Sequence, residues 1–313
     1  MNTKHVPPIA ILWIAAALLC PAVFAQQPAN GIPVHMVVTV EPHHEGDSTA
    51  VTRDDVMVFE GKDRDAVAEW VPAQGDRAGL ELYILIDDSS GTSFGVHMPE
   101  VKKFISEQAA SSKVGVAYMQ NGIARIEQNP TADHELAAKA IRLPLGVVGA
   151  NASPYFALSD LAKKWPQTGR DRHEVVMVTD GIDFYYGIGD MLDPYLSAAI
   201  EDCQRAGIVA SAIYFPGSGH LGHSYWLNYW GQMYLARLAE ETGGESYGIG
   251  FTGNLPDFTP YLADAGRRFD HQYWLTFLAK PEKKAGLRPV KLRTELHNID
   301  LVSANAVYVP ASE

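Results

Sequence analysis

The sequence predicts an α/β fold: a doubly wound, mostly parallel sheet joined to a small β-domain that the N- and C-terminal strands build. Three observations predict it. Apolar, β-branched runs alternate with stretches of helical period between residues 79 and 269. Two of the runs, Leu80–Ile86 and Glu174–Thr179, are apolar over nearly their whole length, which is typical of strands buried on both faces. Strand-like segments without helices between them close the chain.

Composition indicates a globular protein. The 313 residues are 47% hydrophobic, which is enough to bury one large domain and a small one. The formal net charge is -12, and Lys and Arg do not cluster along the chain. Because nucleic-acid phosphates need such clusters, we do not expect a nucleic-acid partner.

The first 25 residues have the pattern of a secretory signal peptide. Lys4 supplies a positive start, Ile9–Cys20 is an apolar run, and Val23–Ala25 offers small residues for cleavage. The apolar run is short for a membrane span, which needs about 20 residues, and no second span follows. We therefore expect a secreted or periplasmic protein; a lipoprotein modified at Cys20 and an uncleaved anchor are the alternatives.

The segments on either side of residues 79–269 have strand character only. Residues 26–78 contain three short runs, which cannot bury a core by themselves: Val34–Val40, Asp54–Gly61 and Val67–Val71. Residues 270–313 contain three more: Gln272–Ala279, Val290–Leu296 and Val302–Val309. We therefore expect both sides to meet in one small β-domain, with the α/β domain inserted after the turn-rich stretch Pro72–Gly79.

Strands and helices follow one another within residues 79–269. Asn121-Gly122 between two apolar runs is a hairpin signal, Pro154 suits a first helical turn, and Gly207 suits a helix end. The expected strands are Leu80–Ile86, Val114–Met119, Ile123–Ile126, Glu174–Thr179, Ile208–Phe215 and Ser246–Gly248. The expected helices are Met98–Ala110, Ala132–Ile141, Pro154–Lys164, Pro194–Ala206, Met233–Thr242 and Pro256–Phe269. This order implies right-handed βαβ units.

Two of these strands end in oxygen-rich stretches. Leu80–Ile86 is followed by Asp87-Asp88-Ser89-Ser90-Gly91-Thr92, and Glu174–Thr179 by Asp180-Gly181. Ligands of open parallel sheets bind beyond the carboxyl ends of the strands, so both stretches face the same edge. Carboxylates and hydroxyls are hard donors, which suit a small hard cation such as Mg2+.

The order of these motifs resembles a von Willebrand factor A domain, whose metal-ion-dependent adhesion site opens with Asp-x-Ser-x-Ser after the first strand. The matching stretches are Asp87–Gly91, Val178–Gly181, Ala206–Val209 with Ala212–Tyr214, and Leu238–Gly244. The flanking segments resemble the VWFA-related secreted proteins of the acidobacterial type. The resemblance covers roughly residues 80 to 265. It implies a Rossmann-like sheet and a protein-binding, adhesion-type module.

The resemblance also implies a ligand set for Mg2+, with Mn2+ and Ca2+ as alternatives. Asp87 would coordinate the ion directly, Ser89 and Ser153 would add hydroxyl oxygens, and Asp180 would hold a coordinated water. Gly91 stands where the family has a second Ser, and Ser153 where it has a Thr. In this family a partner's carboxylate completes the coordination sphere. A vestigial site that holds only water and hydrogen bonds is the alternative.

A second register of the motif uses other residues. Asp88, Ser90 and Thr92 keep all three oxygens of Asp-x-Ser-x-Ser. This register would place Asp87 one residue inside the buried strand, where an unpaired charge is costly. We therefore favour the first register.

Two aromatic, glycine-rich loops follow strands at the same edge. They supply the expected partner contacts, because aromatic anchors with polar neighbours are typical of recognition surfaces. These contacts are Asp183, Tyr185, Tyr186, His220, His223, Tyr225 and Trp226. The alternative is that Trp226 and Trp230, four residues apart, pack a short helix onto the core. We expect the three tyrosines to be more exposed than the tryptophans.

Catalytic patterns are weaker than these binding patterns. His220, His223 and Asp183 could together hold zinc in a metal-dependent hydrolase, but zinc hydrolases place such pairs on a rigid element. No Gly-x-Ser-x-Gly elbow directly follows an expected strand, and no phosphate loop of the Gly-x-x-x-x-Gly-Lys type is present. Cys203 shares a helical stripe with Leu196 and Ile200 and is expected to be buried. The expected function is thus an extracytoplasmic protein-binding module and not an enzyme; the hydrolase and a structural envelope protein with a vestigial site are the alternatives.

Overall fold

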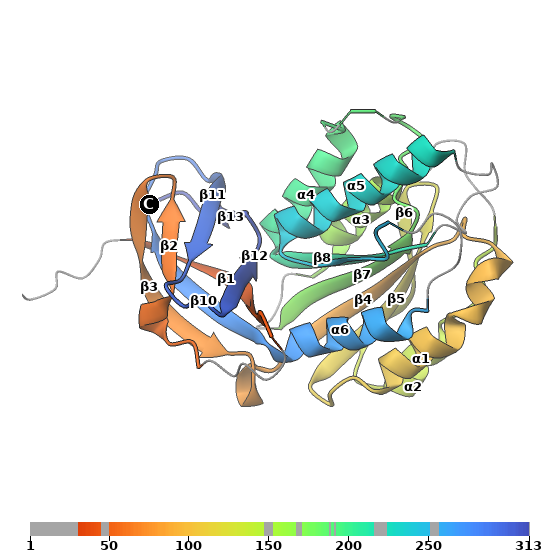
Figure 1. The fold of residues 1–313 in the computed structure, drawn as a ribbon, viewed down its shortest axis with the longest axis horizontal. Helices are drawn as coiled ribbons and strands as arrows, with labels where there is room; N and C mark the ends of the chain where they lie inside the picture. Colours follow the sequence, from red (N-terminus) through yellow and green to blue (C-terminus); the bar gives the residue numbers. More distant parts are fainter. Residues whose placement is uncertain are drawn as a thin grey trace, which may run out of the picture.

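The chain forms two domains that lie side by side (Figure 1). A computed structural model describes residues 31–44, 50–146, 153–166, 171–187, 189–190, 192–215, 224–250 and 257–312. One domain is a curled sheet of strands, and the other is a sheet covered by helices on both faces. The predicted signal peptide lies outside the described residues. No helix among the described residues is long and apolar enough to cross a membrane.

The larger domain contains a six-stranded sheet in the order β6-β5-β4-β7-β8-β9. Its strands are β4 (Leu80–Asp87), β5 (Ser112–Gln120), β6 (Ile123–Thr131), β7 (Arg172–Thr179), β8 (Ile208–Tyr214) and β9 (Ser246–Tyr247). All neighbours run parallel except β5 and β6, which form the antiparallel hairpin that Asn121-Gly122 predicts. The predicted α/β class is confirmed, and the sheet is mixed because of this edge strand.

Helices cover both faces of this sheet (Figure 1). On one face lie α3 (Pro154–Lys164), α4 (Pro194–Ala206) and α5 (Tyr225–Thr242). On the other lie α1 (Met98–Ser106), α2 (His134–Lys139) and α6 (Thr259–Asp270). Strand β4 serves both cores, because successive side chains alternate between the faces: Leu85 joins the first core, and Ile84 and Ile86 join the second. Cys203 is buried in the first core, as predicted.

The terminal segments form a seven-stranded antiparallel sheet in the order β12-β1-β10-β3-β2-β11-β13. Its strands are β1 (Ile32–Pro42), β2 (Met57–Glu60), β3 (Asp63–Pro72), β10 (Gln272–Ala279), β11 (Gly286–Arg293), β12 (Ile299–Ser303) and β13 (Ala306–Val309). The two end strands follow each other along the chain, so the sheet curls around a core that includes Val38, Val58 and Phe277. The single strand expected over residues 302–309 is wrong, because residues 304–305 divide it. Three short 3-10 helices complete the elements of the described residues: Arg53–Asp55, Gly75–Arg77 and Thr92–Val96.

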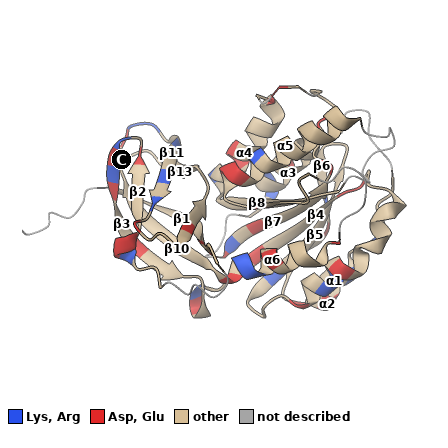
Figure 2. Ribbon diagram, in the orientation of Figure 1, with Lys and Arg blue, Asp and Glu red and all other residues tan. Residues whose placement is uncertain are grey.

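A buried polar network joins the two domains where the chain passes between them. Arg172 donates to the carbonyl of Phe269 and to Oε1 of Gln272, both at 2.6 Å. Gln272 in turn donates from Nε2 to Oε1 of Glu174 at 2.6 Å. Burial raises the pKa of Glu174 to about 8. Elsewhere Lys and Arg are scattered over both domains among acidic residues (Figure 2).

Candidate functional site

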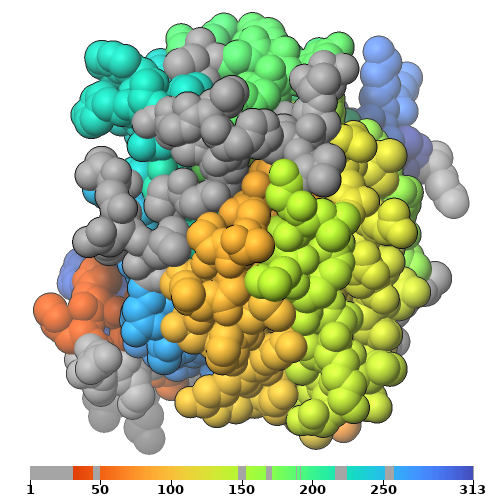
Figure 3. All heavy atoms as spheres, turned by 90° about the vertical axis from the view of Figure 1, so that its right-hand side faces the viewer, coloured from red at the N-terminus to blue at the C-terminus, as the bar shows by residue number. Residues whose placement is uncertain are grey.

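The carboxyl edge of the six-stranded sheet brings the two predicted carboxylates together. Asp87 is the last residue of β4, and Asp180 directly follows β7. Ile86 pairs with Val178 across these neighbouring parallel strands, and this register brings Asp87 and Asp180 close to each other. Figure 3 views the molecule from this side, with the residues that follow β4 in orange near its centre. The edge is therefore the place where a ligand would meet both carboxylates.

Asp87 accepts three hydrogen bonds but has no cationic partner among them. Its Oδ1 accepts from the backbone N–H of Ser89 at 2.9 Å and from the Ser89 hydroxyl at 2.6 Å. Its Oδ2 accepts from the hydroxyl of Thr179 at 2.9 Å. Burial, with the charge of Asp180 as a second cause, raises the pKa of Asp87 to about 6. These contacts fit a carboxylate that a hard cation would stabilise.

The turn that carries Asp180 is packed tightly under helix α5. Asp180 is buried, and its Oδ1 accepts from the backbone N–H of Ile182 at 2.9 Å. A Cβ added at Gly231 of α5 would lie 2.2 Å from the Asp180 carbonyl oxygen. A Cβ added at Gly181 would lie 2.5 Å from the carbonyl oxygen of Gly231, and Gly181 has a positive φ of 71°. Glycine at both positions thus sets the position of Asp180 in the site.

Asp88 belongs to a different network. Its Oδ1 accepts from Arg142 Nη1 and from the backbone N–H of Leu145, both at 2.8 Å. Its Oδ2 accepts from Arg142 Nη2 at 3.2 Å and from Gln120. Burial acts to raise the pKa of Asp88, but the hydrogen bonds from Arg142 and Gln120 outweigh it and hold that pKa below its usual value. Asp88 therefore anchors the loop after α2.

The other two residues of the second register lie in different surroundings. Ser90 is buried, and its hydroxyl has no hydrogen-bond partner within the described structure. Thr92 begins a 3-10 helix and is exposed. With Asp88 already bound to Arg142, the arrangement favours the register of Asp87 and Ser89.

Ser153 and Asp183 form a buried pair behind the edge. Ser153 directly precedes α3, and its hydroxyl donates to Asp183 Oδ2 at 2.8 Å. Asp183 Oδ1 accepts from the backbone N–H groups of Tyr185 and Tyr186, at 2.7 and 3.1 Å. Asp183 is 0% exposed, so the prediction that it contacts a partner is wrong: it fixes the aromatic loop from below. His220 and His223 lie outside the described residues.

Exposed aromatic side chains stand at the same edge; we call Tyr185, Tyr186, Tyr225, Trp226 and Tyr229 the aromatic rim. They are 42% to 65% exposed, and Trp226, at 62%, is more exposed than Tyr185 and Tyr186. The expected ranking of tyrosines above tryptophans is therefore wrong for Trp226 against these two, whereas Tyr225, at 65%, is more exposed than Trp226, and Trp230 is half-buried. The reason is that α5 begins at Tyr225, eight residues before the predicted start, with Ser224 as its N-cap. Trp226 lies on this first turn, and only Trp230 packs against the core.

The rim consists of two groups of rings in contact. Tyr185 and Tyr186 lie 5.2 and 6.1 Å from the ring of Tyr195 on α4. Trp226 lies 5.5 Å from Tyr225 and 6.3 Å from Tyr229. Such neighbouring rings restrict one another, so the rim presents apolar surface with little loss of side-chain freedom on binding.

Three residues of the edge were absent from the predicted site. The Thr179 hydroxyl holds Asp87, and its position in Thr179-Asp180-Gly181 is the signal that could have found it. Arg142 and Gln120 hold Asp88 from 54 and 32 residues away, and no local pattern marks either of them. Within the described residues no group of three or more His, Cys, Asp or Glu is placed to hold a metal ion; the predicted site has two carboxylates and relies on hydroxyls.

The sheet order and the position of both acidic motifs at its carboxyl edge agree with the fold that the sequence resembles. That fold is the von Willebrand A-like fold, with a central, mostly parallel sheet between two layers of helices. No protein-family model matches the sequence, and no curated protein matches it.

Several solved structures are similar to this chain. One is an aerotolerance-related membrane protein from Bacteroides fragilis, at 15% identity and a TM-score of 0.45, over 61% of this chain and 99% of that one. Another is BatB from Bacteroides thetaiotaomicron, at 14% and 0.43, over 61% and 97%. A third is proximal thread matrix protein 1 from the mussel byssus with a zinc-occupied MIDAS motif, at 14% and 0.44, over 61% and 48%. At such identities and TM-scores the likeness carries no conclusion about the function of this chain.

Proposed function

We propose that this chain is an extracytoplasmic protein-interaction module whose binding face is the carboxyl edge of the α/β sheet. The observation that supports the proposal most is the pair Asp87 and Asp180, two neighbouring carboxylates for which the structure provides hydroxyl and backbone donors. A divalent cation would offset their repulsion. The exposed aromatic rim at the same edge supplies the apolar contact area that a protein partner needs.

The hydroxyl groups are oriented in a way that suits a cation. Ser89 donates its proton to Asp87, and Ser153 donates its proton to Asp183. A hydroxyl that donates keeps its oxygen lone pairs, so both oxygens remain able to ligate. Asp87 and Asp180 would supply the negative charge, and the bound ion, Mg2+ or a similar cation, would accept a carboxylate of the partner. We propose binding and not catalysis as the role of this site.

The hydrolase alternative gains no support from these contacts. Its carboxylate, Asp183, is fully buried and already accepts from one hydroxyl and two backbone N–H groups. An oxygen that fixes a loop in this way is not free to position a catalytic zinc ion without releasing that loop.

Thermal unfolding of the full chain tests the proposal. A ligand at 100 times its dissociation constant adds about 2.7 kcal/mol to the native state, which raises the midpoint by a few degrees. We expect Mg2+ or Mn2+ to produce this shift relative to chelator, and Asp87→Asn and Asp180→Asn to lose it. Asp54→Asn is the matched control, because the Asp54 side chain is 91% exposed and far from the edge in sequence. A wild-type midpoint that is the same in Mg2+, Mn2+ and chelator would contradict the proposal.

A further inference from the structure

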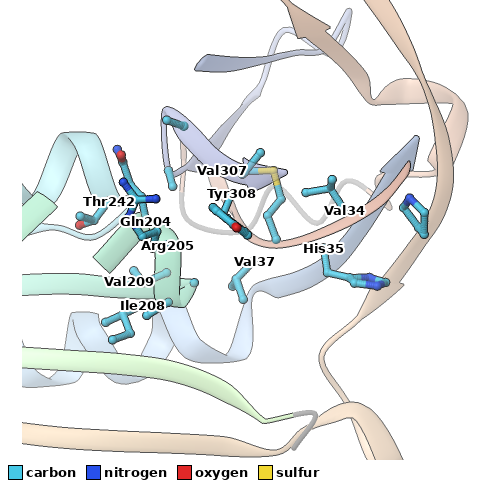
Figure 4. Close-up of a pocket in the computed structure, with 16 residues that line it drawn as sticks. Val34, His35, Val37, Gln204, Arg205, Ile208, Val209, Thr242, Val307 and Tyr308 are labelled. Carbon is cyan, nitrogen blue, oxygen red and sulfur yellow. The ribbon is translucent and has the colours of Figure 1, made fainter. Parts of the chain in front are cut away.

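A cavity of about 290 Å3 lies between the two domains, away from the carboxyl edge (Figure 4). Residues 33–37 of β1 form one wall, and residues 204–209, from the end of α4 to the start of β8, form the second. Ala304 and residues 306–308 form the third. Most of the lining is aliphatic and includes Val34, Val37, Ile208, Val209 and Val307. Interfaces between domains are common places for ligand sites, and none of these residues belongs to the cation site.

One wall of this cavity is a strand edge that lacks a partner. Strand β1 pairs with β10 along residues 32–39, but with β12 only along residues 38–42. No described strand pairs with the other edge of residues 32–37. The backbone N–H of Val40 donates to His271, on the β10 side. Because donors alternate between the two edges of a strand, His35 and Val37 direct their N–H and C=O groups to the open edge.

The opposite wall contributes one cation. Arg205 stands by the cavity, with its guanidinium 5.9 Å from the ring of Tyr308. Its ion pair with Glu201 is 3.7 Å long and both side chains are about half exposed, 48% and 59%, so this pair is weak. Gln204, the neighbouring donor, already donates to the Glu241 carbonyl and to Asn305, both at 2.8 Å. Arg205 therefore remains able to bind an incoming carboxylate.

We propose that this cavity binds an extended peptide segment of a partner protein, which pairs with the open edge of β1 and presents a carboxylate to Arg205. Strand addition satisfies the backbone groups of His35 and Val37, and the aliphatic walls take the side chains of the segment. Arg205 supplies the complementary charge. The site is independent of the cation site, so either can fail without the other.

Fluorescence anisotropy with labelled pentapeptides tests this proposal on the full chain. The probes are Thr-Val-Thr-Val-Thr with a free carboxyl end, the same peptide as a C-terminal amide, and Thr-Val-Thr-Glu-Thr as an amide. They separate an α-carboxylate from a side-chain carboxylate. We expect at least one acidic probe to bind with a dissociation constant below about 1 mM and at least tenfold more tightly than the neutral amide. A copy of the acidic probe that is N-methylated at alternate backbone amides should not bind.

Two variants locate the binding. Val37→Pro removes the N–H that faces the open edge and leaves the hydrogen bonds to β10 in place, so we expect at least a tenfold loss of affinity, whereas Val37→Ala keeps this N–H, shortens only one side chain of the wall and should lose less affinity than Val37→Pro does. Arg205→Gln should bring the acidic probe to the affinity of the neutral amide, and Asp87→Asn should change nothing.

Several results would overturn the proposal. They are no binding of either acidic probe up to 1 mM, equal binding of the N-methylated copy, and an affinity for the acidic probe that Arg205→Gln does not change. A wild-type dimer that Arg205→Gln leaves intact and Val37→Pro abolishes would also overturn it, in favour of a second copy of this chain. If Val37→Pro does not fold, the binding of the N-methylated copy to the wild-type chain decides whether the peptide pairs with β1.

Discussion

Asp87 carries a charge that its hydrogen-bond partners satisfy but do not neutralise. Its pKa of about 6 lies above the ordinary aspartate value of 3.8, with burial as the main cause and Asp180 as the next. The native state therefore binds the proton more tightly than the unfolded state does, so this residue's contribution to stability is present at low pH and is lost as the pH rises through 6. At neutral pH without a cation, Asp87 lowers the free energy of unfolding.

We therefore expect Asp87→Asn to stabilise the protein in chelator at pH 7, by roughly 1 to 3 kcal/mol. Asparagine keeps the shape of the side chain and removes the charge. Denaturant unfolding in chelator measures the difference, and the same experiment in Mg2+ should shrink or reverse it, because only the wild type gains from the ion. Destabilisation in chelator at pH 7 would show that the charge is already compensated.

The charge of Asp88, unlike that of Asp87, has a cationic partner. Two nitrogens of Arg142 donate hydrogen bonds to it, and the Arg142 guanidinium also lies 3.8 Å over the ring of Tyr118. Breaking a buried ion pair leaves an uncompensated charge and costs about 3 to 5 kcal/mol. We expect Arg142→Gln to lower the free energy of unfolding by about this much. Arg142→Lys should recover only part of it, because the single ammonium group of Lys cannot donate from two nitrogens to one carboxylate. Adding Asp88→Asn to Arg142→Gln should recover stability, which a double-mutant cycle would measure.

At the scale of elements, the lack of a side chain at Gly231 lets helix α5 pack closely against the turn that carries Asp180. The Cβ of an alanine at position 231 would lie 2.2 Å from the Asp180 carbonyl oxygen, and backbone cannot move aside cheaply. We expect Gly231→Ala to lower the free energy of unfolding by about 2 kcal/mol or more and to weaken any Mg2+-dependent shift, because the turn that carries Asp180 must move.

Gly266 provides the matched control on α6. An added Cβ there meets only Phe104 at 3.8 Å, which is ordinary contact. Since alanine is favoured over glycine inside a helix, Gly266→Ala should raise the free energy of unfolding by about 0.5 to 1 kcal/mol. Thermal or denaturant unfolding of both variants checks the pair, and equal effects at the two positions would refute the argument from packing.

The elements also show what the sequence can and cannot predict. Apolar runs located the central strands, and because parallel strands end at one edge, they also predicted that Asp87 and Asp180 meet. The start of α5 was missed, although Ser224 is a favoured N-cap residue, because a glycine-rich stretch precedes it. The ion pair of Arg142 and Asp88 joins residues 54 positions apart, and only tertiary packing decides such a contact.

At the scale of the whole molecule, the two domains share a buried junction that titrates. Glu174 is fully buried, its pKa is raised to about 8 by burial, and Gln272 and Arg172 lower it only in part. The ordinary pKa of a glutamate is 4.5, so the native state holds a proton that the unfolded state releases between pH 4.5 and 8. The free energy of unfolding should therefore fall as the pH rises through this range.

Glu174→Gln should remove the upper part of this pH dependence. Glutamine copies the protonated carboxyl and can still accept from Gln272 Nε2 through its own Oε1. We compare the free energy of unfolding at pH 6.5 and 8.5, a window in which Asp87, with a pKa of about 6, has nearly finished titrating. The wild type should lose stability across the window and the variant should not, so that the variant is the more stable protein at pH 8.5. Equal slopes for the two proteins would mean that Glu174 is ionised throughout, and that Arg172 neutralises it within the domain junction.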